Sequence, residues 1–170
     1  IGLYLHIPFC KTKCPYCDFY SMRGDESDRD MYTVSLVESM EDWADRLGRQ
    51  ADTLYFGGGT PSVLGGQNIA MLTRRAKNLF GVDGEITVEC NPSAVDEDFF
   101  ETVADAGVNR ISLGVQSGVE SERKKLGRFS DRAVIEKRIA ECKSAGIENI
   151  SLDVMLGVQN QTLESVSYTH

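Results

Sequence analysis

Short apolar runs and amphipathic segments alternate along this chain. Runs of alternating or continuous apolar residues predict five strands, at residues 3–7, 53–56, 86–90, 110–115 and 150–155. Apolar residues at helical spacing predict four helices between them, at residues 30–47, 68–80, 96–106 and 130–145. Each predicted helix ends just before a glycine, namely Gly48, Gly81, Gly107 or Gly146. This alternation is typical of an α/β fold with a parallel sheet.

A short repeat supports the same reading. Residues 106–108 (AGV) and 111–113 (ISL) recur 39 residues later as residues 145–147 (AGI) and 150–152 (ISL). A strand–helix unit of this length is the repeating element of (βα) barrels and of open doubly wound sheets. The pattern alone leaves both architectures open.

Polar or glycine residues stand at the end of every predicted strand. In chain order they are the cysteine segment from Cys10, the glycine run 57–59, Glu89, Gln116 and Asp153. Because the carboxyl ends of parallel strands share one edge, we expect these groups to meet at a functional rim. The glycine run lacks G-K-[ST] and G-x-G-x-x-G, so it is not a phosphate loop. A carboxylate at the end of an apolar strand needs a partner, either structural or a ligand.

Three cysteines lie within eight residues as C-x3-C-x2-C, at Cys10, Cys14 and Cys17. A disulfide framework would be expected to use an even set in a short secreted chain, and this chain has five cysteines. Structural zinc would be expected to use a second ligand pair, which is missing downstream. The spacing favours three thiolates on an iron–sulfur cubane, with the fourth iron open. Cys90 and Cys142 lie in apolar patterns and are expected to pack as small hydrophobic residues.

Composition limits the class of protein. An apolar fraction of 41% and a charged fraction of 26% are those of a globular protein, with no run long enough to span a membrane. The net charge of −8 argues against a nucleic-acid partner. Free thiols and the lack of a signal peptide favour a cytoplasmic location. The chain begins at Ile1 on a predicted strand, so we expect a piece of a longer protein.

Residues 4–19 (YLHIPFCKTKCPYCDF) resemble the radical S-adenosylmethionine (SAM) motif. More narrowly, they resemble the branch with oxygen-independent coproporphyrinogen III oxidases and HemW-type haem chaperones. Further segments match this branch in order: residues 57–62 (GGGTPS), 89–92 (ECNP), 109–116, 126–128 (LGR) and 153–157 (DVMLG). The resemblance implies a partial (βα)6 barrel cut to about five strands. Residues 1–170 are then an incomplete radical SAM core domain.

The resemblance also implies the cofactors. A [4Fe–4S] cluster is expected on Cys10, Cys14 and Cys17, and its open iron is expected to bind the amino and carboxylate groups of SAM. The methionine end of SAM is expected to contact Gly58, Gly59 and Thr60, and its carboxylate to pair with Arg128. Polar groups of the methionine or ribose are expected on Glu89, Gln116 and Asp153, and two aromatic residues are expected to line the site, Tyr4 and Tyr16.

The residue two positions after the third cysteine divides this branch. Oxidases carry a fourth cysteine there, whereas this chain has Phe19, as the haem chaperones do. The resemblance therefore implies that the parent protein binds and delivers haem, with an oxidase or another radical SAM enzyme as the alternative. A haem or porphyrin ligand, an electron donor and membrane-associated haem acceptors are the implied partners. The chain departs from the family pattern at Phe129 and at residues 158–160.

Overall fold

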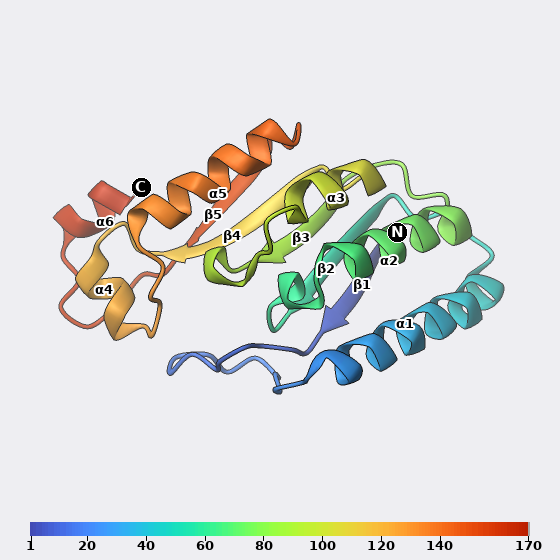
Figure 1. The fold of residues 1–170 in the computed structure, drawn as a ribbon, viewed down its shortest axis with the longest axis horizontal. Helices are drawn as coiled ribbons and strands as arrows, with labels where there is room; N and C mark the ends of the chain where they lie inside the picture. Colours follow the sequence, from blue (N-terminus) through green and yellow to red (C-terminus); the bar gives the residue numbers. More distant parts are fainter. Residues whose placement is uncertain (170) are drawn as a thin grey trace.

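The computed structural model describes residues 1–169 and contains one sheet of five parallel strands (Figure 1). The strands are β1 (Gly2–Ile7), β2 (Thr53–Gly58), β3 (Ile86–Cys90), β4 (Arg110–Gln116) and β5 (Asn149–Val154). They pair in chain order, so β1 and β5 form the two edges. All five predicted strands are present.

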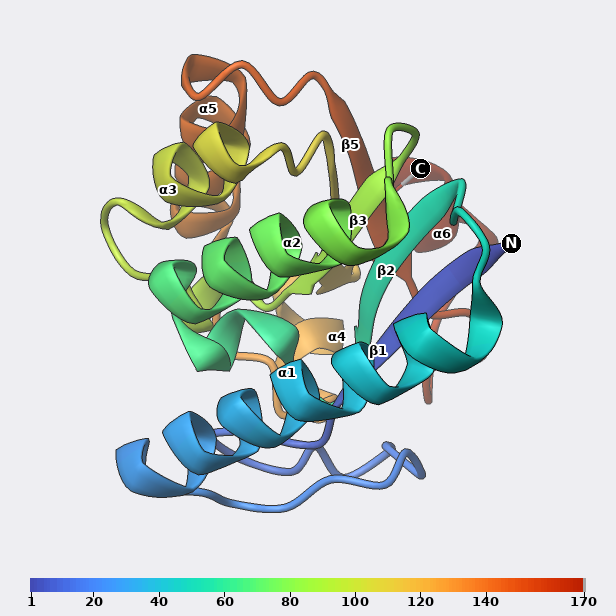
Figure 2. The same cartoon turned by 90° about the vertical axis from the view of Figure 1, so that its right-hand side faces the viewer.

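Four helices cover one face of this sheet, as Figures 1 and 2 show. They are α1 (Glu26–Leu47), α2 (Gly66–Phe80), α3 (Phe99–Ala106) and α5 (Arg132–Ser144). Each helical crossover connects a strand to its neighbour, and successive crossovers proceed across the sheet in one direction. Because such crossovers are right-handed, every helix falls on the same side of the sheet. The result is a partial barrel wall, which confirms the predicted α/β class.

The core lies between the sheet and the helices. Buried apolar side chains alternate along the strands and face this layer, among them Leu5, Ile7, Leu54, Phe56, Val88, Ile111 and Leu113. Cys90 and Cys142 are also buried, as predicted, and burial raises the pKa of Cys142 to about 12. These two thiols therefore remain protonated and pack as small apolar groups.

The alternate strand positions are polar and face the open side of the sheet. Side-chain hydrogen bonds join them across strands: Arg110 Nη2 donates to Ser151 Oγ (3.2 Å) and Ser151 Oγ to Ser112 Oγ (3.1 Å). Ser112 Oγ in turn donates to Asp153 Oδ1 (2.8 Å). This face is therefore organised by polar contacts rather than by apolar packing.

Several helices begin at positions that differ from the prediction. α1 begins at Glu26, before the predicted residue 30, because Asp25 and Asp28 form a reciprocal capping box there. α3 and α5 begin later than predicted; Asp131 caps α5 by accepting from Val134 N (2.8 Å). Short elements that the pattern did not predict also occur: η1 (Pro61–Leu64), η2 (Pro92–Ala94), α4 (Glu120–Lys125) and α6 (Leu163–Thr169). Of the helices within residues 1–169, none has the length and apolar character needed to cross a membrane.

Candidate functional site

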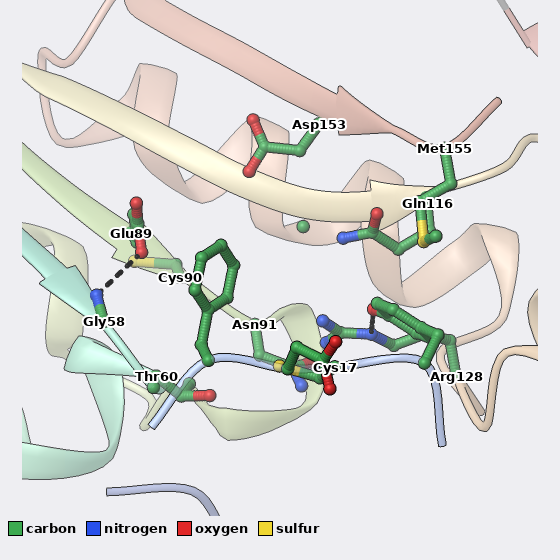
Figure 3. A pocket seen from close by; sticks show the side chains of 15 residues that line it. Cys17, Gly58, Thr60, Glu89, Cys90, Asn91, Gln116, Arg128, Asp153 and Met155 are labelled. Atoms are coloured by element: carbon green, nitrogen blue, oxygen red, sulfur yellow. Dashed lines mark hydrogen bonds between the residues drawn. The ribbon is translucent and has the colours of Figure 1, made fainter. Parts of the chain in front are cut away.

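A cavity of about 490 Å³ opens at the carboxyl ends of the strands (Figure 3). This volume suits a small-molecule ligand, since such sites usually measure about 300–1,000 Å³. Nine of the twelve predicted site residues line it: Tyr16, Cys17, Gly58, Gly59, Thr60, Glu89, Gln116, Arg128 and Asp153. The fold thus brings together groups that lie more than a hundred residues apart in the chain.

The glycine run lets the end of β2 lie directly against the cysteine segment. A Cβ atom on Gly59 would lie only 2.7 Å from the Phe9 carbonyl oxygen and 3.1 Å from Cys10 Sγ. Gly59 N donates to Ile7 O and Thr60 N to Phe9 O, both at 2.8 Å. Glycine at position 59 is therefore required by close backbone approach.

The cysteine segment carries three half-buried thiols without a disulfide. Cys10 Sγ lies 3.4 Å from Thr60 Oγ1, and Cys17 lines the main cavity. Cys14 lines a neighbouring cavity of about 150 Å³, which it shares with Thr60 and Arg128.

The arrangement of these thiols fits a cluster better than a single ion. Across residues 1–169, no three His, Cys, Asp or Glu side chains converge to hold one metal ion. A mononuclear zinc site would need that convergence. In a cubane each thiolate binds a separate iron. Three free thiols on one loop beside an open cavity fit that requirement.

Glu89 has protein partners on two sides and still faces the cavity (Figure 3). Tyr55 OH donates to its Oε1 (2.7 Å) and Gly58 N to its Oε2 (3.3 Å). Burial raises the pKa of the Glu89 carboxyl, while the hydrogen bonds from Tyr55 and Gly58 partly offset that rise. Nearby Asp153 raises it further. Two carboxylates that face one cavity make it attractive to a cationic ligand group.

Arg128 reaches the cavity from the segment between α4 and α5. Its Nε donates to Tyr16 OH (3.0 Å), and its guanidinium lies 6.0 Å from the Tyr16 ring centroid. Within residues 1–169 its two terminal nitrogens make no hydrogen bond, so they are available to a ligand carboxylate. Burial raises the pKa of the Tyr16 hydroxyl, and the Arg128 charge opposes that rise.

Gln116 and Asp153 approach from β4 and β5 (Figure 3). Gln116 has a positive φ of 73° at the irregular end of the β4–β5 ladder. Its carbonyl accepts from Met155 N (2.8 Å), which holds the strained residue in place. The Gln116 side chain lines the cavity.

Three predicted site residues, Tyr4, Cys10 and Cys14, do not line the main cavity. Tyr4 is exposed on the polar face of β1, where it stacks on Tyr55 with centroids 6.0 Å apart. Its hydroxyl lies 3.2 Å from His6 Nδ1. The structure also adds cavity residues that the sequence did not predict, notably Asp18, Asn91 and Met155.

The sequence model of the radical SAM superfamily matches residues 4–169. This chain belongs to the radical SAM superfamily. The match spans the cysteine segment, all the strand ends that line the cavity, and nearly the whole chain.

Two curated relatives and one solved structure refine this assignment. The heme chaperone HemW of Escherichia coli K12 is 40% identical over 169 residues, which cover 96% of this chain and 44% of HemW. Anaerobilin synthase of E. coli O157:H7 is 36% identical over 172 residues, covering 96% of this chain and 38% of that protein. The structure of E. coli coproporphyrinogen III oxidase, HemN, superposes with a TM-score of 0.89 at 28% identity. That superposition covers 99% of this chain and 40% of HemN.

These matches place the chain in the HemW/HemN-like branch of the radical SAM superfamily. The chain spans less than half the length of the curated relatives that it matches.

Proposed function

We propose that this chain is the cofactor-binding part of a HemW-like radical SAM protein, and that the full-length protein containing it binds and delivers haem. The observation that carries the proposal is the cavity that joins the Cys17 thiol of the cysteine segment to two carboxylates and a guanidinium. A reduced [4Fe–4S] cluster, when bound, supplies the electron that cleaves the sulfonium of SAM. The residues of this chain bind, orient and enclose the two cofactors.

The cavity is suited to both ends of the SAM molecule. Arg128 offers two free terminal nitrogens to the methionine carboxylate, and Tyr16 fixes the plane of its guanidinium. Gly58, Gly59 and Thr60 present backbone and hydroxyl groups beside the cysteine segment, where the methionine end must lie.

The remaining predicted residues complete the site. Glu89, Gln116 and Asp153 offer oxygen atoms to the ammonium, sulfonium or ribose groups. Tyr4 lies outside the cavity on the polar face, where it stacks on Tyr55, the hydrogen-bond donor to Glu89. The cluster ligands in this proposal are the thiolates of Cys10, Cys14 and Cys17.

The haem role rests on two further observations. The E. coli relative with 40% identity is a heme chaperone. Phe19 lies at the cavity, exposed, at the position where porphyrinogen oxidases of the branch carry a further cysteine. In this proposal the partners are haem, a protein electron donor and membrane-associated haem acceptors. The protein itself is cytoplasmic and binds no nucleic acid.

Oxygen-independent coproporphyrinogen III oxidase, or another radical SAM enzyme, is the second candidate. The close superposition on HemN favours it, as does the match to anaerobilin synthase. The two candidates differ in what the full-length protein does with a porphyrin, namely carry it or convert it.

The test begins with anaerobic reconstitution and electron paramagnetic resonance. We expect a reduced [4Fe–4S] signal that changes when SAM is added, because SAM binds the open iron. Cys14→Ala should abolish the signal, whereas Cys142→Ala, which removes a buried thiol away from the site, should preserve it. A reconstituted wild-type protein without a cubane signal would contradict the cofactor proposal.

The haem role has its own measurement. The full-length protein should bind haem in a spectroscopic titration and leave coproporphyrinogen III unchanged under anaerobic reducing conditions with SAM. Conversion of coproporphyrinogen III to protoporphyrinogen IX would establish the oxidase instead.

A further inference from the structure

Thr60 lies at the N-cap of a short helix without capping it. It directly precedes η1, and a threonine at such a position commonly accepts a hydrogen bond from a backbone N–H of the first turn. The Thr60 side chain makes no such bond. Its backbone carbonyl accepts from Val63 N (2.9 Å), so backbone hydrogen bonding alone begins this helix. The Thr60 hydroxyl is therefore free for another contact.

That hydroxyl contacts the first thiol of the cysteine segment. Thr60 Oγ1 lies 3.4 Å from Cys10 Sγ in a partly buried position. Backbone hydrogen bonds hold the two segments against each other. Gly59 N donates to Ile7 O (2.8 Å), and Thr60 N donates to Phe9 O (2.8 Å), one residue before Cys10. The pairing of the two segments thus fixes where the hydroxyl lies relative to the thiol.

The state of the thiol decides which group donates in this contact. A neutral thiol and a hydroxyl are both able to donate and to accept. A cysteine that binds iron is a thiolate and carries no proton. Of the two groups, the Thr60 hydroxyl is then the one with a proton, so it donates to Cys10 Sγ.

Thr60 also borders both cavities. It lines the main cavity (Figure 3) and the smaller cavity, where Cys14 lies. A hydroxyl has one proton and two lone pairs. While the proton is donated to Cys10 Sγ, the lone pairs remain available to a donor group in the main cavity, such as the ammonium of SAM. The contact with Cys10 therefore does not exclude a contact between Thr60 and SAM.

We propose that Thr60 sets the reduction potential of the cluster by donating a hydrogen bond to the Cys10 thiolate. This inference rests on the proposed function. Reduction adds one electron, which the protein electron donor supplies, and no covalent bond forms or breaks. Because the cysteine sulfurs share the added negative charge, a hydrogen-bond donor stabilises the reduced cluster more than the oxidised one. The Thr60 hydroxyl therefore raises the potential and makes reduction easier.

The surroundings of the contact favour this effect. Thr60 and Cys10 are both half-buried. A hydrogen bond that is partly shielded from water is electrostatically stronger than an exposed one. The effect of this one hydroxyl on the potential is therefore large enough to measure.

The test compares variants that keep or remove the hydroxyl. Thr60→Val has nearly the shape of threonine and lacks the hydroxyl, whereas Thr60→Ser retains it. Thr12→Val is the matched control, because Thr12 is exposed on the same cysteine segment. Within residues 1–169, the hydroxyl that contacts a thiol of this segment belongs to Thr60 and not to Thr12.

The readout is the potential of the cluster, measured without SAM. Reconstituted full-length protein is titrated potentiometrically and followed by electron paramagnetic resonance. Thr60→Val should lower the equilibrium constant for reduction about tenfold, which is ~59 mV for a one-electron couple. Thr60→Ser and Thr12→Val should each stay within twofold of the wild type. Thr60→Ala also lacks the hydroxyl and should show the same shift, so the result does not depend on cluster assembly in one variant.

The affinity for SAM separates this role from a simple ligand contact. If Thr60 only contacted SAM, Thr60→Val would weaken SAM binding and leave the potential without SAM unchanged. That result would overturn the inference, as would a potential that falls equally in Thr60→Ser or Thr12→Val. A wild-type protein without a cubane signal would instead contradict the proposed function, so the two failures are distinguishable.

Discussion

Arg123 is buried, at 3% exposure, and is held by backbone carbonyls rather than by a carboxylate. Its Nε donates to Ser130 O (3.0 Å) and its Nη1 to Ser117 O (2.8 Å), while its own carbonyl accepts from Arg128 N (2.8 Å). A buried charge is tolerated only with such hydrogen bonds. Ser117 directly follows Gln116, and Ser130 lies two residues after Arg128. The Arg123 side chain therefore fixes the backbone beside both of these cavity residues. We therefore assign Arg123 as a positioning residue.

Arg123→Met should remove both bridges and let Arg128 move. We expect SAM affinity to fall about tenfold, which corresponds to ~1.4 kcal/mol. Affinity for decarboxylated SAM should change little, since that ligand lacks the carboxylate that Arg128 meets. Isothermal titration of the reconstituted full-length protein with both ligands measures this. Arg132→Met, on the exposed surface of α5, is the control. An equal loss for both ligands would show that Arg123 acts on stability alone.

The residue scale also shows what the sequence could reveal about the site. Strand ends and motif order predicted nine of the residues that line the cavity. The partner of Glu89 was not predictable, because the Tyr55–Glu89 hydrogen bond depends on the register of β2 against β3. The role of Arg123 could not be predicted from the sequence either. Its role follows from two backbone carbonyls, and no side-chain pattern in the sequence marks such a contact.

At the scale of elements, the strands were easier to predict than the helices. Strand positions follow from apolar runs, whereas helix starts depend on caps such as the Asp25–Asp28 box. On α1, the apolar side chain of Trp43 is exposed, while the polar side chain of Thr33 is buried. The partial barrel leaves the outer surface of α1 free, so periodicity there does not decide burial. Helix α4 was not predicted, because its six residues are mostly charged and form no apolar stripe.

Glu122 ties α4 to neighbouring segments. Its carboxylate is 4% exposed and accepts from Ser117 Oγ (2.7 Å) and Gln161 Nε2 (3.3 Å). Hydrogen bonds from Ser165, Ser117 and Gln161 hold the pKa of Glu122 below its ordinary value. A carboxyl whose pKa is lowered by folding adds stability above its unfolded pKa and loses it as the pH falls through the folded value.

Glu122→Gln should therefore destabilise the protein at pH 7 and make little difference near pH 3. The urea midpoint of the full-length protein, measured from about pH 7 down to about pH 3, gives the comparison; the wild-type advantage should decline below about pH 4.5. Glu148→Gln, at an exposed position before β5, should leave the midpoint unchanged throughout. A wild-type advantage that persists at pH 3 would contradict the assignment.

At the scale of the whole molecule, β5 is an edge strand with apolar side chains in solvent. Leu152 and Val154 are 45% and 43% exposed, although both belong to an apolar strand pattern. An unpaired edge of this kind templates pairing with another chain. The chain also spans only 44% of the length of E. coli HemW. We therefore expect residues 1–170 in isolation to be poorly stable and inactive in SAM cleavage.

Leu152→Lys provides a direct check on the edge. A lysine there should oppose strand pairing between copies, since charge on an edge strand disfavours association. Sedimentation velocity of isolated residues 1–170 should show self-association in the wild type and predominantly monomer in the variant. Leu163→Lys, on the exposed surface of α6 and outside the sheet, is the matched control and should associate as the wild type does. A wild-type chain that is monomeric, melts cooperatively and cleaves SAM would show that five strands suffice. The edge would then be no source of instability.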